Sequence, residues 1–593
     1  MALSSSKKVF FWLFTIFFPF VLLLLVEIGL RIGNYNQDKQ DLFIEMPEKP
    51  QFLATNPAFP GRYFPGFLPQ VAPAPFLKEK TDDTFRVFVF GGSTTQGFPF
   101  NFNGSFSNRL EQKLLMETQG LNIEVINLGM TAVNSYVIWD LSRRVKDYEP
   151  DAIVIYAGHN EFYGSFGVGS TQFGAGKQVG LKRLTLRLKG SRLYQLFENM
   201  LAGENKNSEN RTLMARVVSE SDIPLGGEVY NAGIDQFRSN ISDVMDIFSE
   251  KGIPVYIGTV ASNLKDQAPL GEDEEALSSF EEAKEALTSG DTESAIEGFK
   301  KAKELDEIRF RAPDEINDVI RELAMKYDAE LVDIYSVSFD SSLSSIPDNS
   351  FFVDHLHPDW DGNQLIGELF FDRMKEVQLN DYYLPNNLSA RPKLNNFEAT
   401  FSDAPVVRLT SGYPFVKGLT PIQEQANFQR VIDGYLKRSY VDSVAASTWR
   451  MKRPIYLGLT DAVNYYFNRG DKTQISDHYI SLGQWQIFND KLLKKGIAET
   501  VTERSLDSNT ALLLHFILNK EERKDSYFIN TLSAVYLLNQ DLDRAGFWLE
   551  KSEKLDPSSS EMLYNYARYH VLAGDTVMAR TYYDRYVEVS GGN

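Results

Sequence analysis

Short apolar runs alternate with longer amphipathic segments over the first half of the chain. The runs lie at 85–92, 123–129, 151–158, 253–260 and 329–335. Each is short and almost continuously apolar, which is typical of a strand buried on both faces. Segments with helical spacing separate them, so the pattern predicts five parallel strands in an α/β/α sandwich. In such a sheet, ligands bind beyond the carboxyl ends of the strands.

A different pattern opens the chain. Lys7 and Lys8 precede an apolar run that starts at residue 9 and reaches residue 32. This length predicts a helix that spans a membrane, here interpreted as a retained signal anchor over 9–32. The lysines favour a cytoplasmic N-terminus, residues 1–8, and a catalytic region outside the cytoplasm, periplasmic or extracellular. A cleaved signal peptide and a buried helix are the alternatives, but no small-x-small cleavage site is visible.

Residues 33–80 are rich in proline and aromatic side chains, which predicts an extended linker. The α/β domain is then expected over 81–380. A charged alanine-containing stretch at about 272–309 resembles a tetratricopeptide-like helical hairpin inserted between the fourth strand and the last helix. We expect this hairpin to pack against the C-terminal helices, and an ordinary charged helical pair is the alternative.

The C-terminal part has helical patterns and a repeat. Tyr536 matches His570 and Ala545 matches Ala579, in each case 34 residues later. This is the tetratricopeptide period, with small residues where two helices cross, so residues 526–593 resemble two tetratricopeptide repeats. Residues 381–525 are expected to be further helices, and the repeats suggest a protein or peptide partner.

Composition narrows the function classes. The 593 residues carry a formal charge of -19, which argues against nucleic acid as a partner. The chain has no cysteine, so disulfides, thiolate metal sites and cysteine nucleophiles are excluded.

Polar residues follow three of the predicted strands. Ser93 comes after Gly91 and Gly92 at the end of the first strand, Gly129 ends the second, and Asn160 follows the third. A phosphate-binding loop is the alternative for the first of these, but no Gly-Lys-Ser/Thr follows. A serine hydroxyl with a glycine N–H and an asparagine amide beside it could attack a carbonyl and stabilise an oxyanion.

Asp354 and His357 complete this set near the end of the α/β domain. They lie three residues apart in "DHLHP", a spacing that places both side chains on one side of a turn. The carboxylate can fix the imidazole tautomer, and the other ring nitrogen can take the serine proton.

Together these stretches resemble the SGNH (GDSL-like) serine hydrolases over about residues 81–380. The resemblance implies a nucleophile at Ser93, oxyanion donors at Gly129 and Asn160, a base at His357 and an orienting Asp354. It also implies a five-stranded parallel α/β/α sandwich and no cofactor. Two residues depart from the family pattern: Gly92 and Glu161 each replace an aspartate.

Several alternatives stay open. His159 and Glu161 are candidate pocket residues beside Asn160, whereas His355 is expected to pack. The stretch "DHLHPDWD" could instead hold zinc through His355, His357 and its aspartates.

The sequence therefore predicts a membrane-anchored serine esterase that cleaves an acyl ester through an acyl-enzyme intermediate. Acetyl is the preferred acyl group, and a cell-envelope glycan or lipid is the expected substrate. Acyl transfer to a polysaccharide would use the same residues. A non-catalytic envelope scaffold that binds partners through its repeats is the rival class.

Overall fold

The computed structural model describes residues 5–64, 68–169, 178–201, 222–385, 388, 390–500, 508–520 and 525–591. Part of the expected cytoplasmic N-terminus, residues 1–4, and the last two residues of the expected second repeat lie outside these ranges.

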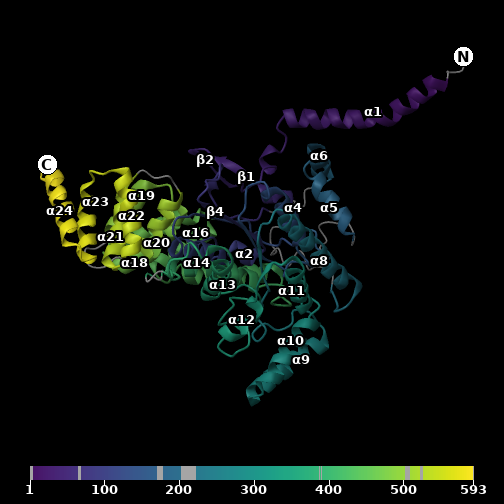
Figure 1. Cartoon of the computed structure of the whole chain (residues 1–593). Helices are drawn as coiled ribbons and strands as arrows, with labels where there is room; N and C mark the ends of the chain where they lie inside the picture. Colours follow the sequence, from purple (N-terminus) through teal and green to yellow (C-terminus); the bar gives the residue numbers. More distant parts are fainter. Residues whose placement is uncertain are drawn as a thin grey trace.

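A five-stranded parallel sheet forms the centre of the α/β domain, in the order β5-β4-β6-β7-β8 (Figure 1). The strands are β4 (Thr84–Gly91), β5 (Asn122–Asn127), β6 (Ala152–Tyr156), β7 (Val255–Gly258) and β8 (Glu330–Val332). The first three are almost entirely buried, in agreement with their continuous apolar sequences. The predicted number and direction of the strands are confirmed.

Helices cover both faces of this sheet. One face carries α4 (Ser135–Val145), α8 (Glu228–Ser249) and α11 (Asp314–Tyr327), and the other carries α3 (Phe106–Glu117) and α13 (Trp360–Met374). Phe90 of β4 stacks on Phe248 of α8, whereas Tyr156 of β6 contacts Phe106 of α3 edge-on. A short helix α12 (Ile334–Ser341) follows β8, and a π-helical turn (Lys375–Leu379) extends α13.

The expected linker over 33–80 contains a small folded sheet instead. Strands β1 (Phe43–Met46), β2 (Lys49–Thr55) and β3 (Phe76–Leu77) pair antiparallel, and two single 3-10 turns (Gln37–Lys39 and Phe59–Arg62) flank β1 and β2. A buried ion pair between Arg86 and Glu124 (2.6 Å) anchors this sheet, because the guanidinium donates to Leu77 O and the carboxylate accepts from Leu77 N. The aromatic residues that suggested a linker are therefore partly core residues, such as Phe43 and Phe76.

The N-terminal helix α1 (Ser5–Ile32) extends away from the rest of the molecule (Figure 1). Its segment Phe11–Ile32 is long and apolar enough to cross a membrane. Near its end, Glu27 accepts hydrogen bonds from the backbone N–H groups of Arg192 and Leu193, at the start of α6 (Arg192–Leu201). Helix α5 (Val179–Leu188) precedes α6. These contacts fix the end of α1 to the α/β domain.

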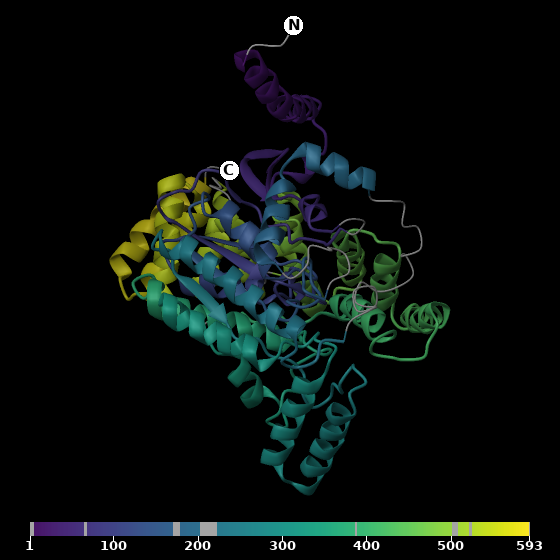
Figure 2. The same ribbon diagram turned by 90° about the vertical axis from the view of Figure 1, so that its right-hand side faces the viewer.

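The expected insertion is a helical hairpin of α9 (Glu274–Ser289) and α10 (Thr292–Leu305). It projects from the α/β domain on the side away from the C-terminus (Figure 2). Phe280, Phe299 and Ala302 form a small core with Ile346 and with Phe339 of α12. The expected packing against the C-terminal helices is therefore wrong, because residues of the α/β domain itself cover the apolar side of the hairpin. Lys417 Nζ joins the base of the hairpin to the helical region through a hydrogen bond to Gly271 O (3.1 Å) and an ion pair with Glu272 (3.6 Å).

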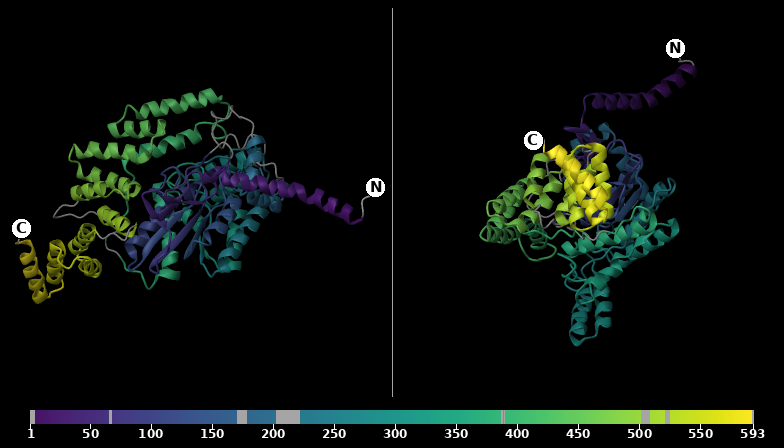
Figure 3. Two further views of the ribbon diagram at one scale, coloured as in Figure 1. Left: turned by 90° about the horizontal axis from the view of Figure 1, so that it is seen from above. Right: turned by 60° about the vertical axis from the view of Figure 1, so that its left-hand side comes forward.

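The helical region curves around one side of the α/β domain (Figure 3). Its helices are α14 (Asn396–Thr410), α15 (Pro421–Tyr435), α16 (Tyr440–Arg450), α17 (Ile455–Phe467), α18 (Lys472–Trp485), α19 (Asp490–Thr500), α20 (Ser508–Lys520), α21 (Ser526–Leu538), α22 (Leu542–Leu555), α23 (Ser560–Leu572) and α24 (Thr576–Ser590). The last four form two hairpins whose first helices start 34 residues apart. The helical hairpins are confirmed, and their likeness to tetratricopeptide repeats stays a prediction.

Buried polar contacts fix the helical region to the α/β domain. Lys520 of α20 pairs with Glu111 of α3 at 2.8 Å, and both side chains are buried. At another point Asn103 donates to Glu398 of α14 at 2.9 Å, again in the interior. Breaking one partner of such a pair would leave a buried unpaired charge, so these contacts favour a fixed arrangement of the two parts.

Candidate active site

Ser93 is the first residue of the short helix α2 (Ser93–Gln96), directly beyond the end of β4. The two preceding residues must be glycines because there is no room for a side chain at either position. A Cβ at Gly91 would lie 2.0 Å from Thr95 Oγ1 and 2.2 Å from Tyr156 O, and a Cβ at Gly92 would lie 2.6 Å from Asn160 Nδ2. The glycines thus let the strand pass closely under Asn160 and turn into the helix that presents Ser93.

Ser93, His357 and Asp354 form a continuous hydrogen-bonded chain. Ser93 Oγ lies 2.7 Å from His357 Nε2, and His357 Nδ1 lies 2.7 Å from Asp354 Oδ2. A carboxylate can only accept, so Nδ1 carries the proton and Nε2 is free to accept from the serine hydroxyl. Ser93 and His357, which are 264 positions apart in the sequence, thus lie with Asp354 in the geometry that a nucleophile, a base and an orienting acid require.

The turn that carries Asp354 and His357 is held by its own backbone. Asp354 Oδ1 accepts from the N–H groups of Leu356 and His357, both at 2.9 Å, and Val353 N donates to His357 O at 2.9 Å. Burial opposes the charge on Asp354, but the imidazoles of His357 and His355 and their hydrogen bonds hold its pKa well below the usual range. Asp354 is therefore ionised at neutral pH.

His355 lies next to this chain, with its Nδ1 3.3 Å from Asp354 Oδ1. Its ring is fully buried between Phe310 and Phe415, with ring centres 6.0 and 5.0 Å away, and burial lowers its pKa. The packing role expected for His355 agrees with this position. Asp354, His355 and His357 offer ligand atoms close enough together for a metal ion. Both ring nitrogens of His357 are already engaged, however, so a metal ion there would have to break the contact with Ser93.

Ser93, Ala132 and Asn160 line one cavity, and each has an N–H group that could act as an oxyanion donor. The Asn160 side chain lies over Gly92. None of these three groups donates a hydrogen bond to a described residue. Ala132 has a φ of 59°, a left-handed conformation that a residue with a Cβ adopts at a cost of about 1–3 kcal/mol. Such strain is typical of a backbone that is held in place for function.

Gly129 does not occupy the position expected for an oxyanion donor. Its N–H donates to Asn127 Oδ1 at 2.8 Å, and a Cβ at this position would lie 2.3 Å from Gln96 N. The expectation for Gly129 is therefore wrong. Its small size lets the chain pass close to α2, and three residues later the same loop reaches the pocket at Ala132.

His159 and Glu161 are also not pocket residues. His159 is buried and accepts from Ala312 N, and burial lowers its pKa to about 3, so it is neutral. Glu161 is buried and accepts from both N and Oγ of Ser135, at the start of α4. Glu161 thereby ties the turn that carries Asn160 to the loop that carries Ala132. We assign it a positioning role in place of the expected contact with substrate.

A small cavity of about 110 Å³ opens beside Ser93. Its walls are mostly apolar, and they come from Phe98, Tyr163, Phe310, Leu356 and, in the helical region, Leu409. Leu409 lies in the last turn of α14, and the loop after this helix carries Phe415 onto His355. The helical region therefore contributes a wall of the cavity beside Ser93, which the sequence pattern around Leu409 does not indicate.

Comparison with known proteins agrees with this geometry. Residues 87–370 match the model of the GDSL-like lipase/acylhydrolase family. The α/β domain is a GDSL-like acylhydrolase domain. This assigns the protein to the enzymes that hydrolyse ester bonds and confirms the family resemblance for this part of the chain. No curated protein sequence matches the chain closely enough to count as a relative.

Several solved structures align with about half of the chain. An acetylxylan esterase from Geobacillus stearothermophilus is 14% identical, with 50% of this chain and 96% of that chain covered and a TM-score of 0.27. A GDSL-like lipase from Bacteroides thetaiotaomicron is 13% identical, with 51% and 93% covered and a TM-score of 0.28. Another acetyl xylan esterase is 14% identical, with 49% and 98% covered and a TM-score of 0.27.

Proposed function

We propose that this acylhydrolase cleaves short acyl esters, acetyl esters above all, by a serine mechanism. Ser93 Oγ attacks the ester carbonyl while His357 Nε2 takes its proton, and Asp354 stabilises the imidazolium that forms. The same imidazolium then protonates the leaving alcohol. Water, activated by His357, releases the acid from the acyl-enzyme. The observation that carries this proposal is the pair of 2.7 Å contacts that link Ser93, His357 and Asp354.

The oxyanion of each tetrahedral intermediate is assigned to the N–H groups of Ser93 and Ala132 and to the Asn160 amide. One such donor contributes about 3 kcal/mol to the transition state. The cavity of about 110 Å³ is far below the roughly 300–1,000 Å³ of pockets that hold larger ligands, so it suits an acetyl or similarly short chain.

The location of the enzyme is part of the proposal. Lys7 and Lys8 before the apolar segment Phe11–Ile32 support a single-pass anchor with its N-terminus in the cytoplasm. The acylhydrolase domain would then act outside the cytoplasm, where glycans and lipids of the cell envelope offer acyl esters.

Labelling by a fluorophosphonate probe tests the mechanism directly. The wild-type protein should be labelled once, at Ser93, and both Ser93→Ala and His357→Ala should abolish or strongly reduce labelling. Ser93→Ala should also lower turnover of 4-nitrophenyl acetate by at least about a thousandfold. A Ser93→Ala protein that keeps about a tenth of the turnover would refute the assignment of the nucleophile. Release of free acid, measured with and without an acceptor sugar, separates hydrolysis from acyl transfer.

A further inference from the structure

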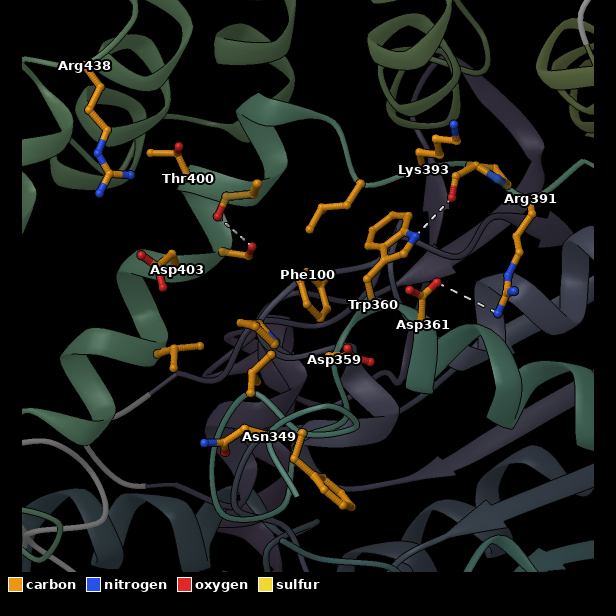
Figure 4. A pocket seen from close by; sticks show the side chains of 18 residues that line it. Phe100, Asn349, Asp359, Trp360, Asp361, Arg391, Lys393, Thr400, Asp403 and Arg438 are labelled. Carbon is orange, nitrogen blue, oxygen red and sulfur yellow. Dashed lines mark hydrogen bonds and ion pairs between the residues drawn. The ribbon is translucent and has the colours of Figure 1, made fainter. Parts of the chain in front are cut away.

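A second and much larger cavity adjoins the catalytic one. This groove of about 1080 Å³ lies between the α/β domain and the helical region (Figure 4). Phe100 and Trp360 form its floor, in an edge-to-face contact with ring centres 5.6 Å apart. Trp360 Nε1 donates to Pro392 O at 3.0 Å, which holds the segment carrying Arg391 and Lys393 at the rim. On the opposite side α14 lines the groove.

The groove begins where the catalytic cavity ends. Phe98 lines the cavity, and the next two residues of the chain line the groove. On α14, Leu409 faces the cavity, and Val406, about one turn earlier, faces the groove. Val353, another groove residue, donates its N–H to the backbone oxygen of His357. When an ester binds at Ser93 with its acyl group in the small cavity, its alcohol part can therefore extend into the groove.

We propose that this groove binds an uncharged oligosaccharide, the alcohol part of the ester. The proposal rests on the proposed esterase function and names its substrate class. Volume is the first argument, because about 1080 Å³ is slightly more than the roughly 300–1,000 Å³ of typical ligand pockets and far more than a small alcohol fills. A chain of several sugar rings requires such a space.

The charges of the lining favour a neutral polar ligand. Three carboxylates line the groove, and three cations balance them: Asp359, Asp361 and Asp403, with Arg391, Lys393 and Arg438. An acidic polymer would meet the three carboxylates, and an acyl chain of a lipid would have to desolvate these polar groups without compensation. Sugar hydroxyls both donate and accept hydrogen bonds and can therefore satisfy either kind of group.

Two cationic side chains are available for such contacts. Lys393 and Arg438 are exposed, and neither side chain donates a hydrogen bond to another described residue. Arg438 is held over the ring of Tyr435, with its Cζ 4.4 Å from the ring centre, so its direction is largely fixed. These two residues lie on the rim rather than beside Ser93, and their loss should leave the chemistry at the serine intact.

The test compares substrates of different length. The wild-type protein, the double variant Lys393→Ala/Arg438→Ala and the control Lys284→Ala/Lys301→Ala are assayed with 4-nitrophenyl acetate and with O-acetylated xylobiose and xylohexaose. The control removes the same charge from the exposed face of the α9–α10 hairpin. We expect KM of the wild type and control to be at least about tenfold lower for the hexasaccharide than for the disaccharide. The groove variant should lose this gain and keep its full activity on 4-nitrophenyl acetate.

Two further probes identify the ligand class. O-acetylated oligogalacturonate represents an acidic glycan, and 4-nitrophenyl palmitate in micelles represents a lipid. The proposal is wrong if either is preferred over the neutral hexasaccharide, if KM does not depend on the length of the neutral chain, or if the groove variant keeps that dependence. Failure to cleave 4-nitrophenyl acetate would instead refute the esterase function. The groove is then still tested by calorimetry, because Ser93→Ala should bind unacetylated xylohexaose and lose this binding with the groove substitutions.

Discussion

The side-chain amide of Asn160 lies so close above Gly92 that a methyl group at position 92 would approach Asn160 Nδ2 to 2.6 Å. Gly92 stands where the GDSL-like pattern has an aspartate, and this contact gives the substitution a physical reason. The backbone of Gly92 has a negative φ, so space and not backbone conformation excludes a side chain. The absence of a side chain at position 92, in the turn before Ser93, thus leaves the space that the Asn160 amide occupies.

This relationship predicts the outcome of a double-mutant cycle. Asn160→Ala should lower kcat on 4-nitrophenyl acetate by about 10²–10³-fold while Ser93 still reacts with a fluorophosphonate. Gly92→Ala should lower kcat through displacement of the same amide. The combined variant should then be no slower than Asn160→Ala alone, because both changes remove one interaction. Independent, multiplying losses would show that Gly92 acts in another way.

Leu409 predicts how acyl-chain selection can be changed. Leu409→Ala removes a wall of the small cavity and should raise the ratio of butyrate to acetate hydrolysis by about tenfold or more, since each methylene accommodated is worth about 1–3 kcal/mol. The matched control is Leu457→Ala, a partly exposed leucine in the same helical region. An unchanged ratio, with normal turnover of acetate, would show that Leu409 does not contact the acyl chain.

The site residues that could be predicted from the sequence are mainly those that directly follow the ends of strands. Ser93 and Asn160 come directly after apolar strands, and Asp354 and His357 share one turn, so their convergence follows from the topology of a parallel sheet. Ala132 could not be found in this way. The loop after β5 runs on past the first glycine, and only the folded chain shows that the Gly129 N–H is bonded to Asn127 while Ala132 is left-handed.

Contacts between distant parts of the chain also could not be predicted from the sequence. Leu409 is an unremarkable apolar residue of a helix, and nothing in the spacing around it indicates that α14 ends at the catalytic cavity. The hairpin insertion shows the same difficulty. Its helices were predictable from their pattern, but their packing on Phe339 and Ile346 depends on which apolar surface lies within reach.

An activity assay without metal distinguishes the catalytic interpretation of "DHLHPDWD" from the zinc-binding one. Both nitrogens of His357 are used by Ser93 and Asp354, so turnover of 4-nitrophenyl acetate should survive dialysis against EDTA unchanged. The matched variant is His355→Gln, which removes the third candidate ligand and should keep most of the activity if it folds, as circular dichroism would report. Loss of activity with EDTA and its return with zinc would establish a metal site.

The last prediction concerns Glu161 and pH. Burial raises the pKa of Glu161 to about 7, well above its value of about 4.3 in an unfolded chain. The folded state therefore holds this proton more tightly, and the wild type should lose stability as pH rises from about 4 through about 7.

Glu161→Gln lacks this ionisation, and its amide can still bond to Ser135. Its free energy of unfolding relative to that of the wild type should therefore rise between about pH 5 and about pH 8, by on the order of 3 kcal/mol at most, which thermal or denaturant unfolding at both pH values measures. Glu297→Gln, on the exposed face of α10, is the control, and its effect should not change over this range. An equal effect of Glu161→Gln at both pH values would mean that Glu161 is ionised throughout, and that the contact between the Asn160 turn and α4 is an ordinary charged hydrogen bond.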